Sequence, residues 1–120
     1  MALEVDKIEF IIPTDYEKEI LNRLNHSYLK ISEMSNEDRE FLTALILRYI
    51  PFKLMEIGVS GGGSSVVLLN AIKENHDAQL FSIDLRSDWY LDPKKKTGFI
   101  VDNYPDLKNK WRLYAKSEKY

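Results

Sequence analysis

The sequence predicts a single α/β domain built around a parallel sheet. A short apolar segment, residues 54–59, is followed by a glycine-rich turn, residues 60–64, by an apolar helix and by a second strand-like segment, residues 80–84. A strand–helix–strand unit of roughly 30 residues is a right-handed parallel crossover almost without exception. The chain of 120 residues also has the length of one domain.

Residues 1–52 are predicted to form an extended segment and two helices that cap the fold. Apolar and polar side chains alternate over residues 1–13, which predicts extended backbone. Thr14 and Glu17 have the spacing of a capping box, in which each side chain satisfies a free amide of the first helical turn. The first helix is expected to reach Tyr28, because apolar side chains recur at helical spacing up to that residue. The side chains are Tyr16, Ile20, Leu21, Leu24 and Tyr28.

The second helix of this cap is expected to start at Ser35 and to end at Pro51. Ser35, Asn36 and Glu37 precede an apolar stripe at helical spacing. Proline stops the helix because it lacks the amide that a continuing helix needs.

The chain after the second strand is predicted to contain a polar loop, a short helix and a third strand. Residues 85–96 are polar and include a run of lysines, so we expect a loop. Residues 97–104 are expected to form a helix that Pro105 ends. Residues 111–114 are the candidate for the third strand.

Composition excludes several classes of function. The chain has no cysteine, which excludes disulfides, thiolate catalysis and cysteine-ligated zinc. His26 and His76 are far apart and neither has a second ligand at metal-site spacing, so no metal site is predicted. No run of apolar residues is long enough to span a membrane, and the N-terminus lacks the pattern of a secretory signal. We therefore expect a cytoplasmic protein with no membrane partner.

The net charge of −2 does not suggest a general nucleic-acid binder. Lysines gather at Lys94–Lys96 and again at Lys108 and Lys110. We interpret them as a solvated surface and expect no nucleic-acid partner.

The glycine-rich turn and Asp84 form the strongest candidate site. Glycines at the end of a strand let the backbone turn sharply and let a ligand approach without meeting a Cβ atom. The helix that follows directs its free amides and its positive dipole end toward that ligand. Asp84 lies 22 residues after Gly62, at the tip of the next strand, where a carboxylate can accept bonds from both ribose hydroxyls. The pattern predicts a ligand that contains a nucleoside.

Glu56 distinguishes between two kinds of nucleoside ligand. A dinucleotide fingerprint reads Gly-x-Gly-x-x-Gly, and this chain has Ser60 at the second glycine of the register that starts at Gly58. A carboxylate two residues before Gly58 would repel a pyrophosphate, but it suits a ligand that carries an ammonium group. S-adenosylmethionine has that ammonium, a ribose and no phosphate, so it fits the pattern better.

On these residues the sequence resembles the class I S-adenosylmethionine-dependent methyltransferases. Their first motif, acidic-x-Gly-x-Gly-x-Gly, is matched from Glu56 to Gly62 with Ser60 at the middle glycine, and residues 81–84 resemble their second motif. Within the family, the chain is similar to small-molecule and sugar O-methyltransferases, whose turn reads Glu-Ile-Gly-x-x-x-Gly-x-Ser, as residues 56–64 do. Further matches in that group are Tyr90, Lys96, Gly98, Trp111 and Leu113.

The resemblance implies a Rossmann-like three-layer sandwich, in which residues 53–120 form part of a cofactor-binding domain and residues 1–52 belong to the same structural unit. In this family pattern Glu56 reaches the amino group of S-adenosylmethionine, Asp84 holds the ribose hydroxyls and Leu85 flanks the adenine ring. The other implied cofactor-binding residues are Gly58, Ser60, Gly61, Gly62 and Ser64.

The resemblance also implies a larger sheet, whereas this sequence ends shortly after the third predicted strand. We therefore expect a truncated domain. The family's catalytic and metal-binding residues follow the fourth strand, so no catalytic residue is predicted, and the methyl acceptor is expected to be a hydroxyl of a small molecule or sugar. The strand at residues 54–59 would lie at a sheet edge, and unpaired edges favour pairing with another chain, so we expect this edge to pair either with a second copy, as a homo-oligomer, or with the missing half of the domain.

Two alternative functions remain open at this point. The same fold also serves as an NAD- or nucleotide-binding domain. A non-catalytic half-domain that works by association is the other alternative.

Overall fold

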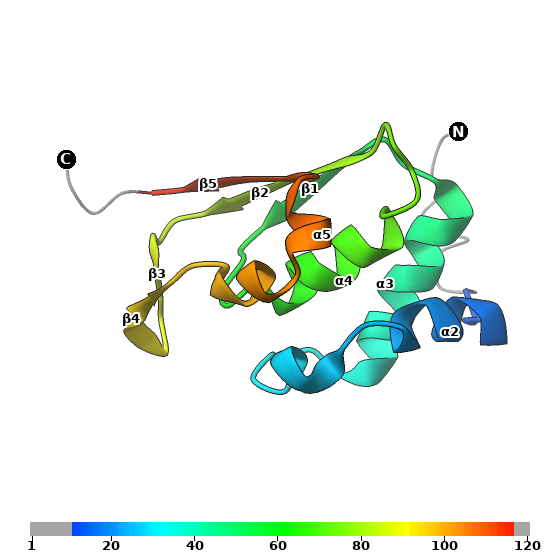
Figure 1. Ribbon diagram of the computed structural model, residues 1–120, viewed down its shortest axis with the longest axis horizontal. Helices are drawn as coiled ribbons and strands as arrows, with labels where there is room; N and C mark the ends of the chain where they lie inside the picture. Colours follow the sequence, from blue (N-terminus) through cyan, green and yellow to red (C-terminus); the bar gives the residue numbers. More distant parts are fainter. Residues whose placement is uncertain (1–10, 117–120) are drawn as a thin grey trace.

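The computed structural model describes residues 11–116. The described chain contains a three-stranded parallel sheet with the strand order β1-β2-β5 (Figure 1). The register places Met55 beside Phe81 and Ser82 beside Leu113. The predicted α/β class with a parallel sheet is therefore confirmed. The strands are β1 (Lys53–Ile57), β2 (Gln79–Asp84) and β5 (Trp111–Ala115).

In the described part of the chain, the helices lie on one face of this sheet (Figure 1). The crossover helix α4 (Gly63–Ala71) connects β1 to β2 and lies against the strands. Two of the three layers expected for the sandwich are thus present within residues 11–116, and the second face of the sheet is open. The core between the helices and the sheet contains fully or nearly fully buried Val66, Leu69, Ile72, Leu80, Ile100 and Val101.

The N-terminal cap begins with the predicted capping box. Thr14 precedes α2 (Asp15–Asn22), its hydroxyl accepts a bond from the Glu17 amide, and the Glu17 carboxylate accepts one from the Thr14 amide. The extended segment predicted for residues 1–13 lies mostly outside the described residues. Residues 11–13 are irregular.

The prediction of one continuous first helix up to Tyr28 is wrong. α2 ends at Asn22, and a separate 3₁₀ helix, η1 (His26–Leu29), follows. The Asn25 side chain accepts a bond from the Ser27 amide and caps η1, which a residue inside a continuous helix does not do. The apolar face also differs from the prediction, because Leu21 is fully buried whereas Tyr16 is exposed.

The second cap helix, α3 (Asn36–Tyr49), begins and ends as predicted. The Ser35 hydroxyl accepts a bond from the Asp38 amide at its start. At its end Ile50 adopts the left-handed conformation, and Pro51 follows. The two cap helices are joined by Arg48 of α3, which donates to the Glu17 carboxylate of α2.

The segment after β2 contains more regular structure than predicted. Residues 85–96, expected to be a loop, include the antiparallel hairpin of β3 (Asp88–Trp89) and β4 (Asp92–Lys96). A 3₁₀ helix, η2 (Phe99–Asn103), then precedes α5 (Pro105–Lys108). Pro105 therefore starts a helix, which it does at no cost because the first helical position needs no amide donor.

Candidate functional site

The predicted ligand-binding turn lies at the carboxyl end of β1, where it leads into α4. Gly58 follows β1 directly, and Gly62 is the residue before α4 in the left-handed conformation. Asp84 lies at the tip of β2, at the same carboxyl end of the sheet. In open parallel sheets ligands bind at the carboxyl ends of the strands, so the fold places the predicted residues where a site is expected.

Asp84 joins the tip of β2 to the turn through its carboxylate. Its Oδ2 atom accepts bonds from the Val59 amide at 2.7 Å and from the Ser60 amide at 3.2 Å. Its Oδ1 atom accepts a bond from the Arg86 amide at 2.9 Å. The carboxylate therefore fixes the conformation of the turn and of the residues after β2 at the same time.

These contacts determine the charge state of Asp84. Burial raises the pKa of its carboxyl group, but the backbone hydrogen bonds from Val59, Arg86 and Ser60 and the charge of Arg86 lower it by more. The net effect is a pKa below the ordinary value. Asp84 is therefore a carboxylate at neutral pH and can accept hydrogen bonds from a ligand.

Glu56 lies on the other side of the turn, in the buried layer between β1 and α4. Its carboxylate accepts bonds from the hydroxyls of Ser64 and Ser65 at 2.5 Å each and of Ser82 at 2.8 Å. Ser82 in turn accepts a bond from the Trp111 indole at 2.9 Å. This chain of hydrogen bonds connects β5, β2, β1 and the start of α4.

The glycines of the turn differ in what surrounds them. A Cβ atom at Gly58 would have no heavy atom within 4 Å, so this backbone is open to a ligand. A Cβ atom at Gly62 would lie 3.1 Å from the Cα atom of Gly98, so Gly62 is required by the packing of residues 97–101 on the turn. The Gly98 amide also donates to the Ser60 carbonyl at 2.8 Å. The backbone at Gly58 is therefore open to a ligand, whereas Gly62 is needed for packing within the protein.

A pocket of about 330 Å³ lies over the turn. The loop before α3, with Glu33, and the first turn of α3, with Asp38, form its opposite wall, and Trp89 of the hairpin forms a third side. The Trp89 indole donates to the Ser60 hydroxyl at 3.1 Å, and the Tyr90 hydroxyl donates to Glu33. The hairpin is therefore connected to both walls of the pocket.

The structure brings together some of the residues predicted for the cofactor and separates others. Gly58, Ser60, Gly61 and Ser64 line the pocket. Asp84 adjoins it through its bonds to the amides of the turn. Leu85 follows Asp84 and is highly exposed.

Glu56 and Gly62 are buried and do not line this pocket. The Glu56 side chain is buried and accepts bonds from Ser64, Ser65 and Ser82, and its contact with a ligand ammonium stays a prediction.

Sequence reasoning missed the loop before α3 as a wall of the pocket. Its residues Ile31, Ser32, Glu33 and Met34 all line the pocket. They show no motif, and their distance from the turn along the chain gives no signal of proximity. The adjacent pair Trp89–Tyr90 was visible in the sequence as two aromatic residues just after the second strand.

Within residues 11–116, no group of three or more His, Cys, Asp or Glu side chains is arranged to hold a metal ion. His26 contacts the Leu21 carbonyl through its ring nitrogen. No helix in this part of the chain is long and apolar enough to cross a membrane.

Comparison with known proteins supports the fold. No family model and no curated protein matches the chain. Among solved structures, the chain is similar to a crystal structure described as "a putative O-methyltransferase from Klebsiella pneumoniae", with 19% sequence identity and a TM-score of 0.54. The match covers 92% of this chain and 47% of the other, so this chain spans about half the length of that protein. The chain therefore has a methyltransferase-like α/β fold.

Proposed function

We propose that this chain binds S-adenosylmethionine and forms the cofactor-binding part of a methyltransferase that acts on a hydroxyl group of a small molecule or sugar. The similarity to the Klebsiella pneumoniae protein supports the reaction class. The cofactor is supported by the chemistry of the turn. A cytoplasmic location is part of the proposal and agrees with a chain that has no cysteine.

One observation carries the proposal: the Asp84 carboxylate, at the tip of β2, is bonded to the turn beside the open backbone of Gly58. Among the described residues its Oδ1 atom accepts a single hydrogen bond, so it retains acceptor capacity for a ribose hydroxyl. The pocket of about 330 Å³ over the turn is large enough for a small ligand, since such sites start at roughly 300 Å³.

The residues of the site fit a nucleoside cofactor that carries a positive charge. Glu33 and Asp38 are the charged residues that line the pocket, and both are acidic. When bound, S-adenosylmethionine supplies a methyl group already activated by its sulfonium. The protein then has to align the acceptor hydroxyl and remove its proton. Asp84, Gly58 and Ser60 would position the cofactor, and we assign no residue to the proton transfer.

Calorimetric titration with S-adenosylmethionine and, separately, with NAD tests this proposal. We expect saturable binding of S-adenosylmethionine and none of NAD. Asp84→Asn retains the size of the side chain but loses charge-assisted bonds, so affinity should fall roughly 10- to 150-fold. Asp92→Asn removes the same charge from the neighbouring hairpin and should leave the affinity unchanged.

The other outcomes would support the two alternatives. Saturation by NAD would identify a nucleotide-binding domain instead. A folded protein that binds neither ligand would favour a half-domain that works by association.

A further inference from the structure

Ser60 has a backbone conformation that is unfavourable for serine. Its φ angle of 55° lies in the left-handed region, which within residues 11–116 only one other non-glycine residue, Ile50, adopts. A side chain in this region costs free energy, and such residues gather at functional sites, where the surroundings hold them in place. A glycine would adopt the same conformation without that cost. The shape of the turn alone therefore does not account for a serine at this position.

All three polar groups of Ser60 are held by hydrogen bonds. The amide donates to Asp84 at 3.2 Å, the carbonyl accepts from the Gly98 amide at 2.8 Å, and the hydroxyl accepts from the Trp89 indole at 3.1 Å. Within residues 11–116 the hydroxyl donates its own proton to no protein acceptor. Ser60 is exposed and lines the pocket, so this proton is available to a ligand.

The indole of Trp89 is fixed by packing. The side chain is 8% exposed, the Phe99 ring centre lies 4.9 Å from it, and the Lys95 ammonium lies 5.7 Å from the ring centre. A Cβ atom at Gly61 would lie 3.5 Å from the indole nitrogen, so the N–H edge of the ring lies against the turn. Trp89 therefore offers its N–H to Ser60 in a defined orientation.

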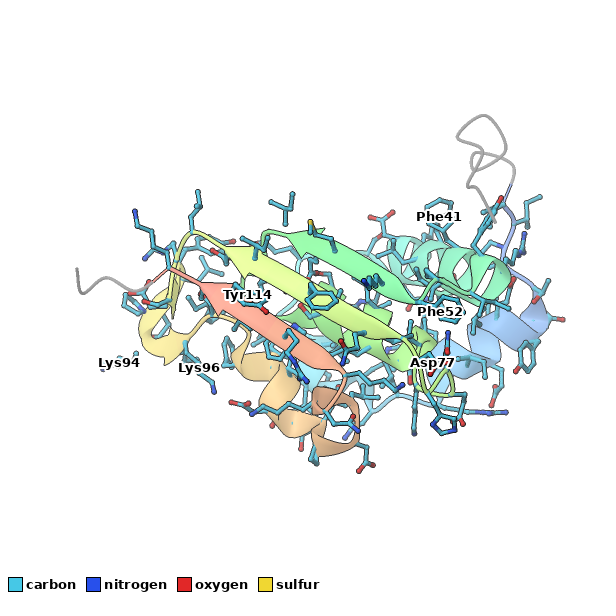
Figure 2. The ribbon with its side chains drawn as sticks, turned by 90° about the horizontal axis from the view of Figure 1, so that it is seen from above. Phe41, Phe52, Asp77, Lys94, Lys96 and Tyr114 are labelled. Atoms are coloured by element: carbon cyan, nitrogen blue, oxygen red, sulfur yellow. The ribbon has the colours of Figure 1, made fainter. Side chains whose placement is uncertain are left out.

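The hairpin that contains Trp89 lies at the carboxyl end of the sheet. Figure 2 shows Lys94 and Lys96 of β4 at that end, opposite Phe52 and Asp77, which come shortly before β1 and β2. The indole therefore approaches the turn from the end of the sheet where a ligand is expected.

We propose that Trp89 is a positioning residue for the cofactor: its indole N–H orients the Ser60 hydroxyl, which donates a hydrogen bond to an acceptor atom of S-adenosylmethionine. This inference rests on the proposed function. Asp84 and Ser60 then recognise opposite features of the ligand, because the Asp84 carboxylate only accepts hydrogen bonds whereas the Ser60 hydroxyl donates one. Trp89 acts through Ser60.

Calorimetric titration of the 120-residue chain with S-adenosylmethionine tests this inference. Trp89→Phe retains an aromatic ring but removes the N–H, so affinity should fall roughly 3- to 10-fold. Ser60→Ala removes the donor itself and should lower affinity roughly tenfold. The double variant should bind as Ser60→Ala does, because no hydroxyl is left to orient. Ser60→Gly, which suits the left-handed conformation, should give the same loss without backbone strain.

Tyr104→Phe is the matched control for Trp89→Phe. Tyr104 is also an aromatic residue that is 8% exposed, and its hydroxyl donates to the Asn25 carbonyl, away from the pocket. Both substitutions remove one hydrogen-bond donor, so both should lower the unfolding temperature measured by circular dichroism. Only Trp89→Phe should change the affinity for S-adenosylmethionine.

Three results would overturn the role of Trp89. They are a Trp89→Phe variant that binds as tightly as the parent, effects of Trp89→Phe and Ser60→Ala that add, and an equal loss of affinity in Tyr104→Phe. A folded parent that does not bind S-adenosylmethionine would overturn the proposed function and this inference together. A parent that binds, with Trp89→Phe unaffected, would overturn this inference alone.

Discussion

The helical cap and the glycine turn each contain a buried glutamate, and the two glutamates are held in different ways. Glu17, between α2 and α3, accepts two bonds from the Arg48 guanidinium, at 2.7 and 2.9 Å. Glu56, between β1 and α4, accepts bonds from serine hydroxyls, and no cation contacts it in the described chain. The cap therefore neutralises its buried charge, whereas the turn retains its negative charge.

This difference separates a structural region from the candidate binding region. A carboxylate paired with arginine has its charge compensated inside the protein. Carboxylates held by neutral donors, as Glu56 is and as Asp84 is by backbone amides, leave a negative potential at the end of the sheet. That potential favours a ligand with a positive charge or with hydroxyl donors.

Replacing Glu56 should have the largest effect on stability. Glu56→Ala removes the acceptor of three hydroxyls, two of which belong to the fully buried Ser65 and Ser82. We expect a loss of about 3 kcal/mol in the free energy of unfolding, measured by urea denaturation. Glu56→Gln keeps one acceptor oxygen and should lose about half as much. A loss below about 1 kcal/mol in Glu56→Ala would show that these hydroxyls find other partners.

Replacing Glu17 should have a smaller effect that depends on pH. The bonds from Arg48 outweigh burial and lower the pKa of Glu17 from 4.5 to about 2. A lowered folded-state pKa means that the stabilisation is complete above the unfolded pKa and is lost as pH falls from 4.5 toward 2. Glu17→Gln should therefore lose about 2 kcal/mol at pH 7 and show a flatter acid denaturation curve.

Glu19→Gln is the matched control for this measurement. Its ion pair with Arg23 is exposed on the same helix, so the change should stay within about 0.5 kcal/mol. An equal acid sensitivity in Glu17→Gln and the parent would contradict the role of the Glu17–Arg48 pair.

The smallest difference in the free energy of unfolding is expected between variants of the two neighbouring serines that bind Glu56. Ser65 is fully buried, so Ser65→Ala should cost about 1.5 kcal/mol because no water replaces its hydroxyl. Ser64 is half-buried, so water can take its place, and Ser64→Ala should cost at most about 0.5 kcal/mol. Urea denaturation of both variants in one buffer measures the difference. Equal losses would place Ser64 and Ser65 in the same environment.

The parts of the fold with strong local signals were predictable from the sequence. The capping box at Thr14 and the cap at Ser35 depend on side chains that bond to nearby amides, so a few adjacent residues specify them. The strand before the glycine turn and the strand after the next helix were equally visible, because an apolar run, a turn and a helix follow each other directly.

Two parts of the fold were not predictable, because their sequence signal is weak or points to another structure. The hairpin at residues 88–96 has a polar sequence. Thr97, directly after it, donates its hydroxyl to the carbonyls of Arg86 and Asp88 across the loop. α2 stops early because Asn25 caps the next turn, while the pattern of apolar residues continues past it.

The candidate site was predictable in its centre and not in its walls. The spacing of Gly58 and Asp84 follows from the strand–helix–strand unit, so both could be placed at the carboxyl end of the sheet. The burial of Glu56 depends on Ser65 and on Ser82 from the neighbouring strand, whose side chains carry no motif. The wall that contains Glu33 comes from a loop more than twenty residues before the turn.

The two tryptophans of the chain are natural optical probes of this site. Trp111 donates its indole N–H to Ser82, at the start of the hydrogen-bond chain to Glu56, and Trp89 donates its indole N–H to Ser60 of the turn. Indole emission depends on the polarity and hydrogen bonding around the ring. The fluorescence of Trp89 should therefore report changes at the ligand-facing side of the turn, while that of Trp111 reports the integrity of the sheet. Single Trp→Phe variants would separate the two signals without any added label.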